Sequence, residues 1–226
     1  MADNMNDRSA TARRRGFTLI EMLILAAVLA MLIALVTQLA AFVRNRGCER
    51  FTAAVIARVD QALVLYQQSC QVYPADRFAP EVRPGPSHGA QTEGVECLVR
   101  AVVGPRVFWS EPRYERALGD TDQDVAADGT PLNELLDGWG RPLLYYHGYG
   151  SDPGGSEQGR PLPAFPGVDP ERMAKLNQSL QVRWVRAGRR PLVDSAGPDG
   201  LFDTTDDCRQ KPLPTDRRYD EEVQPQ

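Results

Sequence analysis

The chain has few of the side chains that carry out chemistry in enzymes. It contains two histidines, His88 and His147, and no recognisable nucleophile accompanies either of them. Ser195 lacks the glycine-flanked turn that exposes the nucleophile of many hydrolases. A glycine-rich loop ending in lysine, which would predict phosphate binding, is also missing. These absences predict that the protein is not an enzyme.

Cysteine is scarce too, and its spacing does not predict a zinc site. The four cysteines are Cys48, Cys70, Cys97 and Cys208. If Cys48 and Cys70 lie on one helix, roughly 33 Å separate them, so they cannot pair within a subunit. An exported location would permit a bridge between Cys70 and Cys97 or a bridge to Cys208. The sequence does not choose between these pairings.

The chain also lacks an excess of positive charge. Its formal net charge is −4, and residues 1–16 hold four arginines and two aspartates, so the remaining chain carries −6. Binding to nucleic acid requires a basic face, and we therefore expect no nucleic-acid partner. The 18 prolines and 19 glycines predict a domain with many turns and long loops.

Side-chain charge is nearly absent from residues 17–43, where Glu21 is the one exception. A membrane-spanning helix needs about 20 mostly apolar residues, whereas the apolar part of a cleaved secretory signal has about 7–15. The segment therefore predicts a membrane anchor preceded by Arg13, Arg14 and Arg15. An ionised side chain in the hydrocarbon layer costs roughly 2.5–3.5 kcal/mol, so Glu21 requires a partner.

The string Gly16-Phe17-Thr18-Leu19-Ile20-Glu21 resembles the cleavage and methylation site of type IV pilins and type II secretion pseudopilins. The resemblance implies that a prepilin peptidase removes the leader, residues 1–16, by cutting between Gly16 and Phe17, and methylates Phe17. Glu21 then becomes the fifth residue of the mature chain. The α-amino cation of one subunit can pair with Glu21 of a neighbour, each neutralising the other. We expect Glu21 to be an assembly residue.

Helical periodicity continues beyond the membrane segment. Apolar residues recur at steps of three or four from Cys48 to Cys70, and Tyr73-Pro74 is expected to end the helix. We predict one helix from Phe17 to about Gln71, roughly 80 Å long. Residues 17–43 form its transmembrane part and residues 44–73 its periplasmic half. The apolar stripe is either a coiled-coil seam or, as we favour, the face that packs on the chain's own domain.

The remaining pattern predicts a globular domain over residues 74–208 and a polar tail over residues 209–226. Turn-forming residues predict loops at 75–91 and 150–167, and the charged segment 109–133 is interpreted as a surface insertion. The expected elements are a helix over 94–103, a short helix opening at Asp169-Pro170-Glu171, and strands over 143–147, 181–187 and 192–193.

A second notable feature is an acidic loop that contains Asp199, Asp203, Asp206 and Asp207. Aspartate and glycine are common in solvated turns, which explains the composition without any ligand. Carboxylates converging over such a turn can also hold calcium, which takes six to eight oxygen ligands. The spacing does not match an EF-hand, and both interpretations stay open on residues alone.

Residues 137–145, Asp-Gly-Trp-Gly-Arg-Pro-Leu-Leu-Tyr, and residues 195–200, Ser-Ala-Gly-Pro-Asp-Gly, resemble the C-terminal domain of the major pseudopilin of type II secretion. In that family the C-terminal loop binds calcium. The resemblance therefore implies calcium ligands at Asp199 and Asp206, with Asp203 or Asp207 as further candidates. The domain is longer than is usual for the family, with insertions near 75–92, 106–134 and 148–180, so the chain can also be a minor subunit.

Together these features predict an α+β, pilin-like fold, with a long membrane-embedded N-terminal helix packed on a small antiparallel sheet with long loops. We expect a structural subunit in the bacterial inner membrane, with a single span and its C-terminal domain in the periplasm. The expected assembly is a periplasmic pseudopilus of type II secretion, with other pseudopilins, prepilin peptidase, the inner-membrane secretion platform and membrane lipid as partners. The alternatives are a type IV pilin of a surface fibre, for adhesion, motility or DNA uptake, and a membrane-anchored periplasmic binding module that does not polymerise.

Overall fold

The computed structural model describes residues 17–78, 92–102, 112–126, 128–148, 161–165 and 167–210. The chain forms two compact units, residues 1–44 and 45–226, and the boundary between them falls within the first helix. The predicted leader, residues 79–91 of the loop predicted at 75–91, residues 150–160 of the loop predicted at 150–167, and the tail from residue 211 lie outside the described residues.

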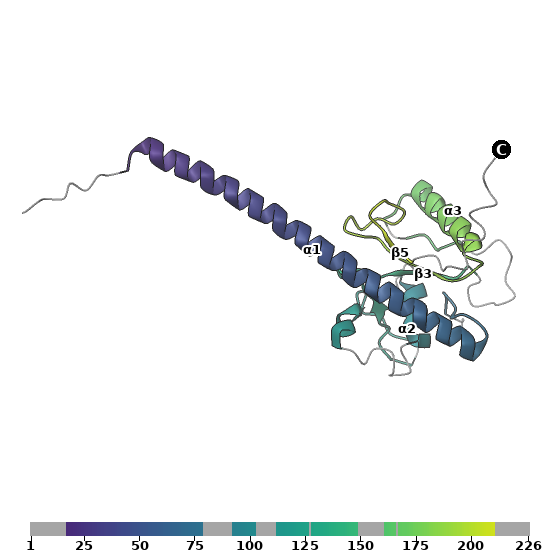
Figure 1. Cartoon of the computed structure of the whole chain (residues 1–226). Helices are drawn as coiled ribbons and strands as arrows, with labels where there is room; N and C mark the ends of the chain where they lie inside the picture. The colour runs from purple at the N-terminus through teal and green to yellow at the C-terminus, as the bar shows by residue number, and fades with distance from the viewer. Residues whose placement is uncertain are drawn as a thin grey trace, which may run out of the picture. The chain divides into compact units, whose positions relative to one another are not determined.

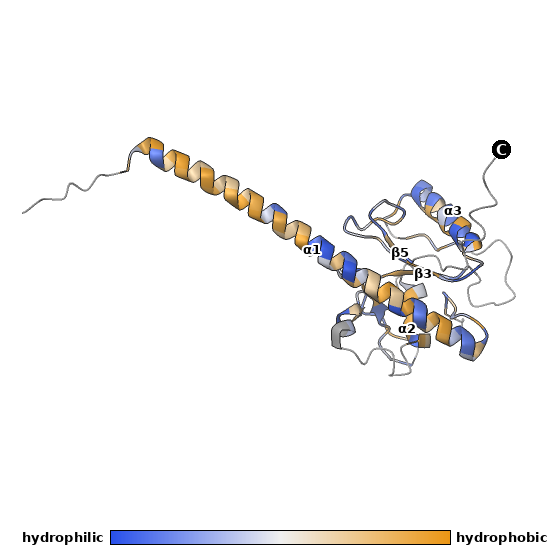
Figure 2. Ribbon diagram, viewed as in Figure 1, coloured by the Kyte–Doolittle hydropathy of each residue, from blue (hydrophilic) through white to orange (hydrophobic). Residues whose placement is uncertain are grey.

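The first helix, α1, runs from Leu19 to Cys70 (Figure 1). The prediction of one helix from Phe17 to about Gln71 is confirmed to within two residues. Gln71 has a positive φ of 62°, which is the left-handed conformation that commonly follows the last turn of a helix. Within the described residues, α1 is the one helix long and apolar enough to cross a membrane. Its N-terminal half is mostly hydrophobic, with few hydrophilic residues such as Glu21 in the first turn (Figure 2).

The C-terminal half of α1 packs on the globular domain. Its buried face packs against the second helix, α2 (Glu93–Val102), in one core. The α1 residues of this core are Val55, Ile56, Val59, Ala62 and Leu63. The stripe predicted from the sequence therefore faces the chain's own domain, as we favoured, rather than a coiled-coil partner.

A three-stranded antiparallel sheet lies between two cores. Its strands are β3 (Leu144–Tyr146), β4 (Leu192–Ser195) and β5 (Cys208–Arg209), in the order β3-β4-β5. Because side chains alternate between the faces of a strand, Tyr145 enters the core shared with α1 and α2, while Leu144 and Tyr146 enter a second core. The predicted strands at 143–147 and 192–193 are confirmed with slightly different ends, whereas β5 was missed.

The second core is covered by α3 (Pro170–Arg186). Asp169 caps this helix, because its Oδ2 accepts a hydrogen bond from the Arg172 N–H at 3.2 Å, and Pro170 occupies the first helical position as predicted. The helix is joined to the sheet by two hydrogen bonds from Arg183 to the buried Asp194, of 2.6 and 2.7 Å.

The prediction of a strand over residues 181–187 is wrong, since residues 181–186 form the end of α3. The alternation of Val182 with Trp184 suggested a strand. However, Leu180 and Trp184 are four residues apart and both fully buried, while Val182 and Val185 are about half-exposed. That spacing continues the buried stripe of a helix, which begins at Met173 and Leu176.

The interpretation of residues 109–133 as a surface insertion is also wrong for the part that the structure describes. A 3₁₀ helix, η1 (Pro112–Ala117), leads into β1 (Leu118–Gly119), which pairs with β2 (Glu134–Leu135). The segment contributes four buried apolar side chains to two cores, those of Tyr114, Ala117, Ala126 and Leu132. These residues are too few and too irregularly spaced to produce a periodic signal.

The sequence analysis placed the end of the globular domain at residue 208 and the start of the tail at residue 209. Arg209, assigned to the tail, pairs with Asp194 as the last residue of β5.

The four cysteines are free thiols, with Cys97 buried and Cys70 exposed.

Candidate functional site

The start of α1 is closed by reciprocal hydrogen bonds between Thr18 and Glu21. The Glu21 Oε2 accepts hydrogen bonds from the Thr18 N–H and from the Thr18 hydroxyl, each at 2.9 Å. In return, the Thr18 Oγ1 accepts one from the Glu21 N–H at 3.3 Å. This arrangement is a capping box, which satisfies two backbone donors that a helix start leaves without partners.

The capping box gives Glu21 a role that the sequence analysis missed, although the Thr-x-x-Glu spacing is its usual signal. The carboxylate also lies at the positive end of the helix dipole, which favours a negative charge. Phe17 directly precedes the box and is 73% exposed, whereas Gly16 lies outside the described residues. The negative charge of Glu21 is therefore partly compensated by groups of its own helix.

Comparison with protein-family models finds one match to this segment, described as "Prokaryotic N-terminal methylation motif", over residues 11–37. The chain carries the prokaryotic N-terminal methylation motif. The motif supports membership of the pilin-like family, and it implies processing by prepilin peptidase and assembly with other pilin-like subunits. The comparisons with curated proteins and with solved structures found no match.

A second candidate site lies where two turns meet. Asp137 is buried, and its Oδ1 accepts hydrogen bonds from the backbone N–H groups of Trp139 and Arg141 at 2.8 and 3.0 Å. Its other oxygen accepts one from the Ser195 hydroxyl at 2.7 Å. The Arg141 guanidinium in turn donates to the carbonyl of Gly197 at 2.7 Å. The two segments singled out at 137–145 and 195–200 are thus joined, and together they position the start of the acidic loop.

The 137–141 turn is also attached to α1. The Gly138 N–H donates to the hydroxyl of Thr52 at 2.9 Å, and Thr52 is fully buried. A side chain at position 138 would overlap the backbone of Cys48, so this close approach requires glycine. The acidic loop is consequently connected to α1 through a chain of buried and partly buried hydrogen bonds.

Three of the four carboxylates of the acidic loop, those of Asp199, Asp206 and Asp207, accept hydrogen bonds from donors of the loop itself. Asp199 accepts a hydrogen bond from the Leu201 N–H at 2.8 Å, and Asp207 accepts one from the Asp203 N–H, also at 2.8 Å. The Thr204 hydroxyl donates to Asp206 at 2.5 Å, and this hydrogen bond is the main cause that lowers the pKa of Asp206. These four aspartates all lie in the described part of the chain, and no three of them bring their carboxylate oxygens within 4.8 Å of one another. Calcium binding by the four stays a prediction.

A different group of acidic side chains does converge, and the sequence analysis did not identify it. Carboxylate oxygens of Glu96, Asp122 and Glu134 lie within 4.8 Å of one another. Asp120, Asp122 and Asp124 form an overlapping group, and their alternate spacing was the signal available in the sequence. Glu134 accepts hydrogen bonds from the N–H and hydroxyl of Thr121. Glu96 and Glu134 come from α2 and β2, and both are buried.

Burial and charge alter the acidity of this group. Burial is the main cause that raises the pKa of Glu96, to about 8, and the neighbouring carboxylates of Asp124, Asp122 and Glu134 raise it further. Burial also raises the pKa of Glu134. The raised pKa of Glu96 favours its protonated form at neutral pH.

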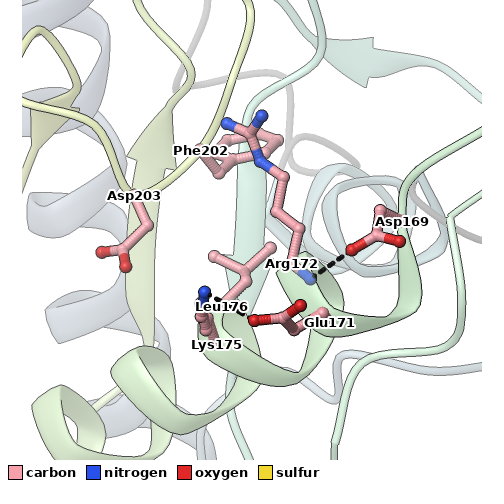
Figure 3. A pocket seen from close by; sticks show the side chains of 7 residues that line it. All are labelled: Asp169, Glu171, Arg172, Lys175, Leu176, Phe202 and Asp203. Atoms are coloured by element: carbon pink, nitrogen blue, oxygen red, sulfur yellow. Dashed lines mark hydrogen bonds and ion pairs between the residues drawn. The ribbon is translucent and has the colours of Figure 1, made fainter.

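A charged hollow lies between the first turns of α3 and the acidic loop (Figure 3). Its volume is about 350 Å³, and its lining residues are Asp169, Glu171, Arg172, Lys175, Leu176, Phe202 and Asp203. Lys175 pairs with Glu171 at 2.9 Å. Because both signs of charge line the hollow, it does not indicate one class of ligand.

His147 and Ser195, the described residues considered for chemistry, both have structural partners. The His147 ring packs edge-on against Tyr73, and its backbone N–H donates to Asp76 at 2.8 Å. Burial lowers the pKa of the His147 imidazole. The Ser195 hydroxyl donates to Asp137. His88 lies outside the described residues.

Proposed function

We propose that this chain is a pseudopilin, a structural subunit that assembles from the inner membrane into a short periplasmic pseudopilus and pushes folded substrates outward in type II secretion. The observation that carries the proposal is the placement of Glu21. It lies in the first turn of an apolar helix, inside a matched methylation motif, five residues beyond the expected cut.

Assembly follows from the electrostatics of that first turn. Cleavage before Phe17 creates an α-amino cation next to the capping box. Both Thr18 donors bind Oε2 of Glu21, so in the proposed filament Oε1 accepts the α-amino group of an adjacent subunit. The pairing neutralises two charges that are costly in lipid and sets the axial register between neighbouring helices.

Secretion rather than a surface fibre is supported by the globular domain. The residues that resemble the major pseudopilin, 137–145 and 195–200, make direct contact through Asp137, Ser195 and Arg141. The resemblance thus concerns one contiguous piece of structure. It does not depend on scattered residues. The larger domain leaves the chain's rank within the filament, major or minor, open.

The test has two steps, performed in cells that contain a type II system. Mass spectrometry of the protein first determines whether the mature chain begins with methylated Phe17. Glu21→Ala is then compared with Thr37→Ala, which removes a hydroxyl bonded within the same helix. We expect both variants to insert and be processed, but only Thr37→Ala to enter filaments.

Two results would contradict the proposal. If the natural product keeps residues 1–16 and remains monomeric, the chain is a membrane-anchored module. If overproduction gives long surface fibres seen by electron microscopy, and loss of the chain leaves secretion unchanged, it is a type IV pilin.

A further inference from the structure

Arg209, which follows the acidic loop in the chain, binds two carboxylates of that loop with its guanidinium group. The Nη2 atom of Arg209 lies 3.0 Å from Oδ2 of Asp207 and 3.2 Å from Oδ1 of Asp203. The same nitrogen lies 3.4 Å from the backbone oxygen of Thr204. One cationic nitrogen thus faces three oxygens that belong to the predicted calcium loop.

We infer that Arg209 supplies the counter-charge that orders residues 199–207, so that this loop holds its fold without a metal ion. The side chain of Asp207 is 1% exposed, and that of Arg209 is 37% exposed. A buried carboxylate is costly unless a charge or several donors compensate it. Arginine suits this role because its guanidinium stays protonated at all relevant pH values and presents several donors.

The backbone fixes Arg209 in this position. It is the last residue of β5 and pairs with Asp194 on β4, and Arg183 of α3 binds that same Asp194. The strand therefore directs Arg209 back toward the loop that precedes it. A tail residue, as the sequence suggested, would have no such constraint.

Other protein groups hold the rest of the loop. The Ser179 hydroxyl of α3 donates to Asp203 at 2.8 Å, and Phe202 packs against the core under α3. Arg141 binds the carbonyls of Gly197 and Pro198 at the loop's start. With Asp203 and Asp207 engaged by a guanidinium, the residues present do not fit a calcium site that uses all four aspartates. A dication there would also be repelled by Arg209.

The inference is independent of filament assembly, because it is tested on the isolated mature chain in detergent. Thermal unfolding is followed for the wild type and for Arg209→Gln, first with added calcium and then with EDTA. Arg186→Gln, which removes an equal charge from an exposed side chain at the end of α3, is the control.

We expect the wild-type transition to be the same with calcium and with EDTA. The Arg209→Gln transition is expected to lie about 2–4 °C below that of Arg186→Gln, a typical shift for losing one such interaction in a chain of this size. A wild-type transition that rises with calcium would overturn the inference, and so would an Arg209→Gln variant that unfolds together with the control. The wild-type measurement decides the matter even if Arg209→Gln does not accumulate.

Discussion

Glu21 accepts two hydrogen bonds from Thr18, one from its backbone N–H and one from its hydroxyl, at the first turn of α1. The residue proposed to bind a neighbouring subunit is thus already part of a local cap. The two roles are compatible, because both bonds use the same carboxylate oxygen. The two roles can also be separated by experiment, because capping requires Thr18 and the proposed pairing with a neighbouring subunit does not.

The first prediction separates capping from assembly. Thr18→Ala removes the hydroxyl that donates to Glu21 and accepts from its N–H. Loss of such a cap costs about 1 kcal/mol, and we expect faster amide hydrogen exchange in the first turn of α1. Filament incorporation should continue, since the Glu21 carboxylate remains. Failure of Thr18→Ala to assemble, to the same degree as Glu21→Ala, would show that the cap itself is what assembly requires.

The second prediction concerns the junction of the two turns. Asp137→Ala leaves the backbone N–H groups of Trp139 and Arg141 and the hydroxyl of Ser195 without their acceptor. Leaving such buried or partly buried donors unsatisfied costs about 1–3 kcal/mol, which urea unfolding of the mature chain would measure.

A suitable control for Asp137→Ala is Glu171→Ala. It removes an exposed carboxylate paired with Lys175 on α3, and such pairs contribute about 0.3–0.5 kcal/mol. Equal losses in the two variants would show that the junction does not stabilise the domain.

The third prediction tests α3. Trp184 is fully buried in the second core, next to Tyr146, so Trp184→Ala is expected to lower the free energy of unfolding by about 3–5 kcal/mol. Val185 is 52% exposed, and Val185→Ala is expected to change it by no more than about 0.5 kcal/mol. In a strand over 181–187, the residue next to Trp184 would face the opposite side of the sheet, and Val182 would share the buried face of Trp184. A large loss in Val182→Ala would therefore favour the strand.

The fourth prediction is a pH dependence of stability. The pKa of Glu96 is raised in the folded protein from an ordinary value of 4.5 to about 8. Between these two values the folded state binds more protons than the unfolded state, so the free energy of unfolding decreases as the pH rises. The contribution of Glu96 is fully present below pH 4.5 and is lost above about pH 8. Its slope between them is at most about 1.4 kcal/mol per pH unit.

Glu96→Gln isolates this contribution from that of His147. The lowered pKa of His147 makes stability decrease as the pH falls, which opposes Glu96 in the acidic part of the range. Urea unfolding of both proteins at several pH values gives the difference. We expect the wild type to lose stability relative to Glu96→Gln as the pH rises toward 8. A difference that does not vary with pH would mean that Glu96 is ionised throughout.

The extent of α1 and the methylation motif could be predicted from short-range patterns in the sequence. The apolar run, the proline at position 74 and the stripe between Cys48 and Cys70 gave the extent of α1 almost to the residue. A long regular period averages over many residues, so no single tertiary contact can overturn it. The expectation of a methylation motif at Gly16-Phe17 and Glu21 rests on contiguous residues for the same reason, and the family match covers them.

The structure of short segments could not be predicted in this way, because it depends on the parts of the chain that pack against them. Val182 and Trp184 alternate as in a strand, yet the core below Leu180 and Trp184 selects a helix. Asp122 and Glu134 look like surface charges in the sequence, and only the pairing of β1 with β2 and the packing of α2 bring them beside Glu96.

The sequence by itself determined the long apolar helix, its methylation motif and the presence of an acidic loop, because each depends on residues that are adjacent in the chain. Tertiary structure alone decided which charges neutralise that loop. Arg209 reaches Asp203 and Asp207 because β5 pairs with β4, a contact between distant parts of the chain that no local pattern encodes.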